Sequence, residues 1–221
     1  IWLTASNKIV AEDTTFETAN YSDEAASREG GNVRFLAGKK VSVGTSKINS
    51  VGNVDVTSQN YDVVLDKTEV VAAKDVNVKA ANIASIQNGS NVSGKNVSLN
   101  GKARAQVNNS AVTAKEDVNI ESEELAWTEK AEINAGKDIN VKATKGSLLL
   151  NNSLMAAKNN INLSSKDSVS SQKLAGTTFT ADKDVNVEST ADSVILTSTS
   201  QFQPKASLNL NAAKNVEINS K

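Results

Sequence analysis

The sequence predicts an all-β protein folded as a right-handed parallel β-helix, a solenoid in which three short strands make one coil. Apolar-polar-apolar triplets recur along the chain about every 21 residues. Each interval holds two further short apolar segments, and Gly, Asn, Ser, Lys and Asp separate the three segments. A fixed period with this content is typical of a stacked repeat in which each coil is one structural unit.

The triplets mark the first strand of each coil. In "AGKDINV" (135–141) the final apolar side chains alternate with a polar one, which is the period of a strand. Close copies, "AAKDVNV", "SGKNVSL", "AKEDVNI" and "ADKDVNV", recur with successive triplet spacings of 21, 22, 21, 21, 21, 22, 24 and 23 residues. The triplets begin at Val33, Val54, Val76, Val97, Val118, Ile139, Ile161, Val185 and Leu208.

The second and third strands follow each triplet after about 8 to 10 and about 15 to 18 residues, and they are rich in β-branched residues and Leu. Ile1, Ile9 and Phe16 fit the same template. This gives roughly ten coils and, at about 4.8 Å per coil, an axis of roughly 43 Å. Second-strand positions are Val41, Val63, Ile86, Val107, Trp127, Leu148, Val169, Val194 and Val216. Third-strand positions are Ile48, Val70, Val92, Val112, Ile133, Leu154, Phe179 and Phe202.

Two segments resemble triplet motifs by their letters but fall elsewhere by their spacing. "AGKKVSV" (37–43) and "AAKNVEI" (212–218) carry their apolar residues about eight positions after Val33 and Leu208. We assign both to second strands, because the coil and not the motif sets the register of a repeat.

Composition and charge exclude several classes of protein. The chain of 221 residues is 38% hydrophobic and 4% aromatic, which suits a narrow core of Val, Ile and Leu. A net charge of -1, with 24 basic and 25 acidic residues interleaved, argues against a nucleic-acid partner. The absence of Cys and His removes disulfides, thiolate chemistry and the commonest zinc ligand. No apolar run approaches the ~18 residues of a membrane-spanning helix.

Outward side chains of stacked coils should form columns along the axis. Asparagines in the middle of the triplets are expected to hydrogen-bond to one another up the column. Lysines before the triplets form a second column, and the Asp or Asn beside each lysine offsets the repulsion between like charges. The asparagine column comprises Asn77, Asn119, Asn140, Asn162, Asn186 and Asn209. The lysine column comprises Lys74, Lys95, Lys137, Lys158 and Lys183.

The units "AGKDINV", "AAKDVNV" and "GGNVRF" resemble the haemagglutinin repeats of filamentous-haemagglutinin-like exoproteins, from about Gly30 to the end. The resemblance implies the secreted partner of a bacterial two-partner secretion system. Such proteins cross the outer membrane through a dedicated transporter and fold outside as long β-helices. They are adhesins, haemolysins or contact-dependent growth-inhibition effectors.

We therefore expect residues 1–221 to be a single β-helix segment of a longer exoprotein, on the bacterial cell surface or secreted. Its first residue is Ile1, and it lacks the Asn-Pro motif of the family's secretion domains, since Pro204 is the only proline. The expected function is that of an adhesin or elongated stalk that meets host or bacterial surface molecules, protein or glycan. Regions outside this segment would bind the transporter. Open strand edges at the coil ends also predict end-to-end self-association.

A β-helical polysaccharide-degrading enzyme is the less favoured alternative. The densest acidic cluster is Glu116-Asp117 with Glu121, Glu123 and Glu124, and paired carboxylates can hydrolyse glycosides. A solvated outer face explains these residues more simply, and the arginines Arg28, Arg34 and Arg104 are not obviously paired with them. We expect no enzymatic activity, no cofactor and no metal site.

An insertion at 17–31, "ETANYSDEAASREGG", lengthens the first coil by about eleven residues. Insertions in solenoids form external loops, often on a binding face, and this one resembles a short helix capped by Ser22. Tyr21 and Arg28 are therefore candidate partner-binding residues, because both residue types make contact hot spots. A passive loop that covers an irregular corner is the alternative.

Two further features carry weaker signals. Trp2 and Trp127 could stack on sugars, although packing in or beside the core is the simpler interpretation of Trp127. Asn-X-Ser sequences occur at Asn20, Asn88, Asn91, Asn96, Asn108, Asn151 and Asn162, as expected by chance in a chain rich in Asn and Ser.

Overall fold

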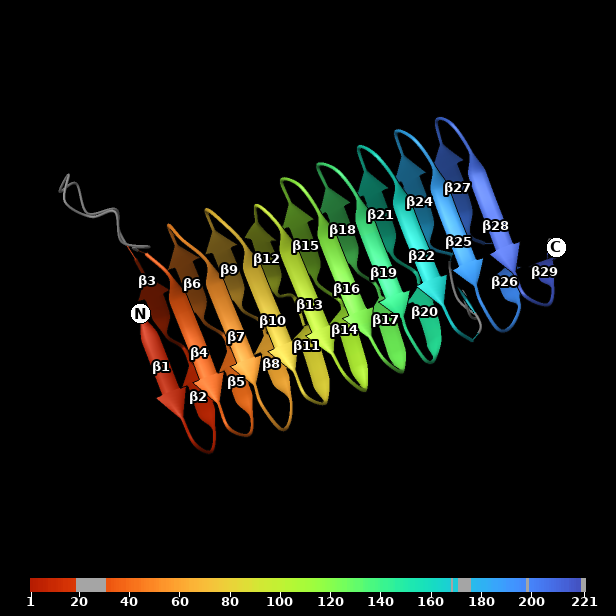
Figure 1. The fold of residues 1–221 in the computed structure, drawn as a ribbon. Helices are drawn as coiled ribbons and strands as arrows, with labels where there is room; N and C mark the ends of the chain where they lie inside the picture. Colours follow the sequence, from red (N-terminus) through yellow and green to blue (C-terminus); the bar gives the residue numbers. More distant parts are fainter. Residues whose placement is uncertain (19–30, 168, 171–175, 198, 220–221) are drawn as a thin grey trace.

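The computed structural model describes residues 1–18, 31–167, 169–170, 176–197 and 199–219, which form three parallel β-sheets wound into one solenoid (Figure 1). The chain advances along one axis, and its N and C termini lie at opposite ends (Figure 1). The described residues include no helix long and apolar enough to cross a membrane.

Each coil contributes one strand to each sheet. The first sheet holds ten strands: β1 (Trp2–Ala5), β4 (Val33–Ala37), β7 (Val54–Ser58), β10 (Val76–Ala80), β13 (Val97–Gly101), β16 (Val118–Ser122), β19 (Ile139–Ala143), β22 (Ile161–Ser165), β25 (Val185–Ser189) and β28 (Leu208–Ala212). The second also holds ten: β2 (Ile9–Glu12), β5 (Val41–Gly44), β8 (Val63–Asp66), β11 (Ile83–Gln87), β14 (Arg104–Asn108), β17 (Leu125–Glu129), β20 (Ser147–Asn151), β23 (Val169–Ser170), β26 (Val194–Thr197) and β29 (Val216–Asn219).

The third sheet holds nine strands among the described residues: β3 (Thr15–Glu17), β6 (Lys47–Ser50), β9 (Glu69–Ala72), β12 (Asn91–Gly94), β15 (Ala111–Ala114), β18 (Glu132–Ala135), β21 (Leu154–Ala157), β24 (Thr178–Ala181) and β27 (Gln201–Pro204). The three sheets together make the predicted coil of three short strands, with about 22 residues per turn. The all-β parallel solenoid is thereby confirmed, and its handedness stays a prediction.

The register of the sheets follows the triplet spacing. Val118 pairs with Val97 on one side and Ile139 on the other, so equivalent triplet positions stack directly. The two ambiguous segments lie where the spacing puts them, since β5 and β29 are second-sheet strands. The backbone hydrogen bonds of each parallel sheet join successive coils. The number of residues in a coil therefore determines which residues of neighbouring strands pair with each other.

Inward side chains form a continuous core along the axis. First-sheet strands alternate buried and outward residues, as in β7, where Val54 and Val56 are fully buried. Each buried Val, Leu or Ile contributes about 1.5–3 kcal/mol relative to exposure. Aromatic pairs fill the core near both ends. Phe16 packs edge-on against Phe35, and Phe179 stacks on Phe202, each pair with ring centroids 4.9 Å apart.

Two of the expected apolar positions do not face the core. Leu154 is exposed, and its neighbour Met155 is the buried residue of β21. Trp127 points outward and is half-buried, while Ala126 and Thr128 on either side face inward. Both differences have the same cause. Where apolar or long side chains are adjacent in the chain, either could face the core, and only the pairing with the neighbouring coils decides which one does.

The corner between the second and third sheets repeats a left-handed turn. Among the described residues, seven that are not glycine have φ between 44° and 57°: Asp13, Thr45, Lys67, Asn88, Asn109, Lys130 and Asn152. A hydroxyl side chain follows most of them inside the corner and accepts a hydrogen bond from the coil before. Thr68 N donates to Ser90 Oγ at 3.0 Å, and Ser90 N donates to Ser110 Oγ at 3.1 Å. These hydroxyls satisfy backbone groups that the tight turn leaves unpaired.

The insertion begins and ends at one point of the solenoid. Thr18 Oγ1 donates to Gly31 O at 2.6 Å, so the two ends of the segment meet between β3 and β4. Tyr21 and Arg28, the candidate partner-binding residues, lie outside the described residues.

Candidate functional site

The acidic cluster does not form one site. Glu116 lies at the corner between β15 and β16, where its carboxylate bridges Lys95 Nζ at 3.7 Å and Lys137 Nζ at 3.2 Å. Glu123 and Glu124 follow the opposite end of β16, and Glu121 points outward from that strand. The carboxylates thus occupy different edges of the solenoid and do not converge as a hydrolytic pair must. Within the described part of the chain no three acidic side chains come together as a cluster that could hold a metal ion.

Glu123 is instead a member of an exposed ion pair. Lys145 Nζ donates to Glu123 Oε2 at 2.6 Å, one coil away. This hydrogen bond lowers the pKa of Glu123 and raises the pKa of Lys145, because it favours the charged form of each group. Both effects belong to a solvated surface pair and not to a group prepared for proton transfer.

The predicted asparagine ladder is present on the outer face of the first sheet. Asn140 Nδ2 donates to Asn119 Oδ1 at 2.9 Å, and the next three steps, through Asn162, Asn186 and Asn209, each measure 2.8 Å. Asn77 lies outside this run, because Ser98 separates it from Asn119, and it donates to Asp55 at 2.9 Å instead. Asn119 begins the run as an acceptor, and each later amide donates to the coil before it.

A second ladder, which the sequence pattern did not reveal, lines the corner between the third and first sheets. Here a side-chain oxygen of one coil accepts from the backbone N–H of the equivalent residue in the next. Asp138 N donates to Asp117 Oδ1 at 3.1 Å, and Asn160 N donates to Asp138 Oδ1 at 2.9 Å. The ladder joins Asn32, Asn53, Asp75, Asn96, Asp117, Asp138, Asn160, Asp184 and Ser207. The signal was in the sequence, since each position before a triplet is Asp, Asn or Ser.

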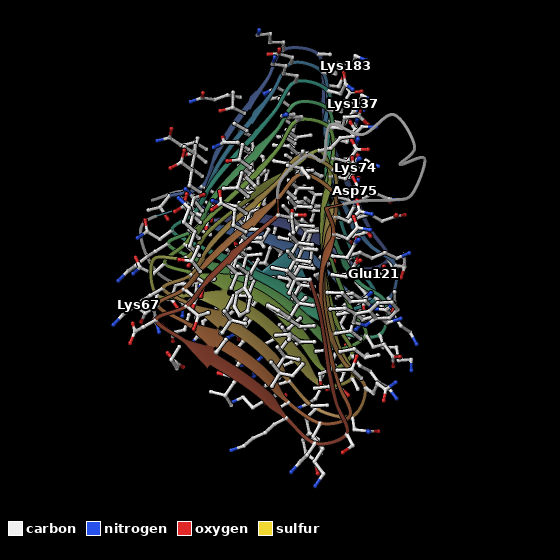
Figure 2. All side chains as sticks on the ribbon, turned by 90° about the vertical axis from the view of Figure 1, so that its left-hand side faces the viewer. Lys67, Lys74, Asp75, Glu121, Lys137 and Lys183 are labelled. Carbon is white, nitrogen blue, oxygen red and sulfur yellow. The ribbon has the colours of Figure 1, made fainter. Side chains whose placement is uncertain are left out.

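The lysine column is largely as expected, with one correction. Lys74, Lys137 and Lys183 lie along one edge of the solenoid, with Asp75 beside Lys74 (Figure 2). Lys158 is one residue out of the column, because Asn159 N bonds to Lys137 O and Lys183 N bonds to Asn159 O. Glu116 occupies the column between Lys95 and Lys137. The corner before Ile161 is as long as the corner before Ile139, but its lysine stands three residues before the triplet, where Lys137 stands two residues before it.

A shallow groove of about 850 Å³ runs along the third sheet beside this edge. Its floor consists of small or short outward side chains, one per coil: Val71, Ser93, Thr113, Asn134, Ala156 and Thr180. Lys115 and Lys158 stand at its margin.

The two tryptophans lie on outer faces and each pairs with an arginine. Arg34 Cζ lies 5.2 Å from the ring centroid of Trp2, and Arg104 Cζ lies 5.6 Å from that of Trp127. Neither ring is in the core, so Trp127 packs beside the core and not within it.

Comparison with known proteins gave one family. The hemagglutinin repeat model matches residues 122–172, which extend from the end of β16 through β23. The search of curated proteins found no match, and the search of solved structures found none either. The matched residues share their strand order and register with the coils on both sides. The chain thus carries a hemagglutinin repeat on a parallel β-solenoid, the combination found in filamentous-haemagglutinin-like exoproteins.

Proposed function

We propose that this chain is a non-enzymatic segment of a large secreted bacterial surface exoprotein, acting as an adhesin or an elongated stalk in attachment to host or neighbouring cells. The observation that carries the proposal is the continuity of the three sheets from one end of the described chain to the other. Each coil adds about 4.8 Å along the axis. Additional repeats of this kind lengthen the rod and leave the cross-section of its core unchanged.

The outer ladders support a stiff rod. A solenoid coil contacts only its neighbours, so bending requires the opening of contacts between adjacent coils. The corner ladder adds a side-chain hydrogen bond at eight of these steps, and the asparagine ladder adds one at four. A stiff rod keeps its far end at a fixed distance from its base. This suits a stalk that presents a binding surface away from the cell.

The non-enzymatic part of the proposal rests on the acidic residues. The groups that could act on a glycoside are divided between two corners, and Glu116 and Glu123 are each neutralised by lysines. Hemagglutinin repeats are in general non-catalytic. A contact-dependent growth-inhibition protein would use the same rod to deliver a toxin, and the cell type that the chain contacts distinguishes the two roles.

The experiment is saturable binding of the labelled chain to epithelial cells and to bacteria. We expect binding to epithelial cells for a host adhesin and to bacteria for contact-dependent inhibition. A matched variant replaces residues 19–30 with two glycines, which the short distance between Thr18 and Gly31 allows. Loss of binding in this variant would place the site in the insertion.

A second variant tests the stalk role in the exoprotein. Deletion of residues 97–138 removes two coils in register, because Ile139 then takes the place of Val97. We expect surface display to persist and attachment to fall. Unchanged attachment after this deletion, together with no binding by the isolated chain, would contradict both the adhesin and the stalk.

A further inference from the structure

Trp127 lies at the centre of the outer face of the second sheet. Its register partners are Gln106 in the coil before and Leu149 in the coil after. The outward residues around them are mostly amides and hydroxyls: Ser85, Gln87, Asn108, Ser147 and Asn151. A half-buried aromatic ring among short polar side chains gives a flat surface with both an apolar and a hydrogen-bonding part.

Arg104 supplies this surface with a positive charge that lacks a counter-ion. Its register partners are the apolar residues Ile83 and Leu125. Among the described ion pairs none includes Arg104, and its Nε is a buried donor with no hydrogen-bond partner. A guanidinium beside an aromatic ring and free of carboxylates is complementary to an anion.

A chain of hydrogen bonds holds the guanidinium in place. Arg104 Nη1 donates to Gln106 Oε1 at 3.3 Å, and Gln106 Nε2 donates to Ser85 Oγ at 2.8 Å. Ser85, which is only 1% exposed, donates to Gln87 Oε1 at 2.8 Å, and Gln87 donates to Asp66 at 2.8 Å. The arginine is thus ordered before a ligand arrives, which lowers the entropic cost of binding.

The other Trp-Arg pair of the chain differs in this respect. Arg34 stands between Trp2 and Asp55 in the register of the first sheet, so a carboxylate lies on the next coil beside it. Asp55 accepts a hydrogen bond from Asn77, and within the described ion pairs none joins Asp55 to Arg34. Trp2 and Arg34 therefore serve as a matched control with the same residue types and a different electrostatic environment.

We propose that Trp127 and Arg104 form a binding site for a single carboxylated sugar, the terminal sialic acid of a glycan. The sugar ring packs against the part of the indole that the guanidinium leaves uncovered, and its carboxylate accepts hydrogen bonds from the guanidinium. Gln106 acts as a positioning residue for Arg104. This inference rests on the adhesive role proposed above and names the chemistry of the partner.

The surface favours one charged sugar over an acidic polysaccharide. Among the outward residues of β8, β11, β14, β17 and β20, all within the described chain, Arg104 is the single cation. A polymer with a negative charge on every sugar would need a row of cations along the axis, and this face instead offers Asp66 and Glu129. The amides and hydroxyls suit the uncharged groups of one sugar residue.

The test is titration of the whole chain with sialyllactose, followed by Trp fluorescence and by ligand-observed NMR. Lactose and the methyl ester of sialyllactose are the comparison ligands, because they lack the sugar and the charge respectively. We expect saturable binding of sialyllactose and weak or no binding of the other two. Equal responses to all three ligands, or none to sialyllactose, would overturn the proposal.

Variants separate the site from the fold. Arg104→Gln should weaken sialyllactose binding about tenfold or more, as expected for the loss of a charge-assisted hydrogen bond. Trp127→Ala should abolish the fluorescence response and the binding seen by NMR, while Gln106→Ala should give an intermediate loss. Arg34→Gln should leave the affinity unchanged. Because all four side chains point outward, circular dichroism should report the same β content in every variant.

Cell binding distinguishes this proposal from the broader one. If the chain binds cells, and both sialidase treatment of the cells and Arg104→Gln reduce the binding, the adhesive function and the sialic-acid site both stand. If the chain binds cells and neither sialidase treatment nor Arg104→Gln lowers the binding, the adhesive function stands and the sialic-acid site is wrong. If Arg104→Gln reduces binding to cells but sialidase does not, the surface takes a protein partner and the glycan proposal fails.

Discussion

Asn140 Nδ2 donates a 2.9 Å hydrogen bond to Asn119 Oδ1 one coil before it, and Asn140 Oδ1 accepts from Asn162 at 2.8 Å. Asn140 is therefore both donor and acceptor in the ladder. Asn119 uses only its acceptor there, since the residue before it in the register is Ser98. The same substitution at Asn140 and at Asn119 therefore removes a donor from the ladder in one case and not in the other. Comparing the two measures what the ladder contributes to stability.

Asn140→Asp should lower the free energy of unfolding by about 1–2 kcal/mol. The carboxylate can no longer donate, and its oxygen faces Asn119 Oδ1. Asn119→Asp keeps the acceptor that Asn140 needs and should cost much less. Urea denaturation of both variants measures the difference, and equal losses would mean that the ladder contributes nothing.

Val118→Asp should unfold several coils. Val118 is fully buried between Val97 and Ile139, and an unpaired charge there costs more than about 4 kcal/mol. The neighbouring outward substitution Asn119→Asp is the control, because it introduces the same side chain one residue away. Circular dichroism and proteolysis report the outcome, and similar losses in the two variants would contradict the register.

Ala131→Ser should stabilise the chain by about 0.5–1.5 kcal/mol. Ala131 occupies a corner position at which the neighbouring coils carry Ser110 and Ser153, and it interrupts the hydroxyl ladder. A hydroxyl at this position can accept from Ser110 N, as Ser110 Oγ accepts from Ser90 N. Thermal unfolding checks the gain, with the inward Ala126→Ser as a control that should destabilise.

Thr45→Asn should raise stability by up to about 1 kcal/mol. Thr45 has φ 45°, a conformation in which a β-branched side chain is strained and asparagine is tolerated. Asn88, Asn109 and Asn152 already occupy the same corner in other coils. Thr57→Asn, on strand β7, is the matched control and should give no gain; a gain there as large as at Thr45 would show that backbone strain is not the cause.

The pair of Glu123 and Lys145 should give a small stabilisation that depends on pH. The hydrogen bond from Lys145 lowers the pKa of Glu123 from its ordinary 4.5, so the contribution is present above that value. It is lost as pH falls through the lowered pKa of the folded state. NMR titration should show the carboxyl pKa of Glu123 rise in Lys145→Ala, and this rise should shrink in high salt. An unchanged titration would contradict the pairing.

Repetition made most of the fold predictable. The starts of ten coils could be predicted because apolar residues, mostly Val, Ile or Leu, recur at the two inward positions of the triplet. In many coils Asn occupies the outward position between them. Prediction failed where one coil departs from its neighbours. Leu154 and Met155 are adjacent apolar residues and either could face inward. Lys158 lies three residues before its triplet, where the other column lysines lie two before theirs, so it falls one position out of the column.

The candidate binding surface was less accessible to sequence reasoning. The sequence singled out Trp127 as a residue that could stack on sugars. It did not show the neighbours of Trp127 across the sheet, which lie about 21 residues away in the chain on either side. That Arg104 lies between Ile83 and Leu125, and Arg34 next to Asp55, depends on the register of each strand pair. The contrast between an arginine with apolar register partners and one with a carboxylate as register partner is a property of the stacking.

The period, the three strands of each coil and the column of asparagines could be predicted from the amino-acid order, because each feature recurs in many coils and one irregular coil does not hide it. The contacts between side chains of different coils could not be predicted in this way and became known from the stacking of the coils. Those contacts form between residues far apart in the chain, and a shift of one residue in register turns a side chain from the core to the surface. The charge that remains unpaired at Arg104 is set by those contacts and by no local motif.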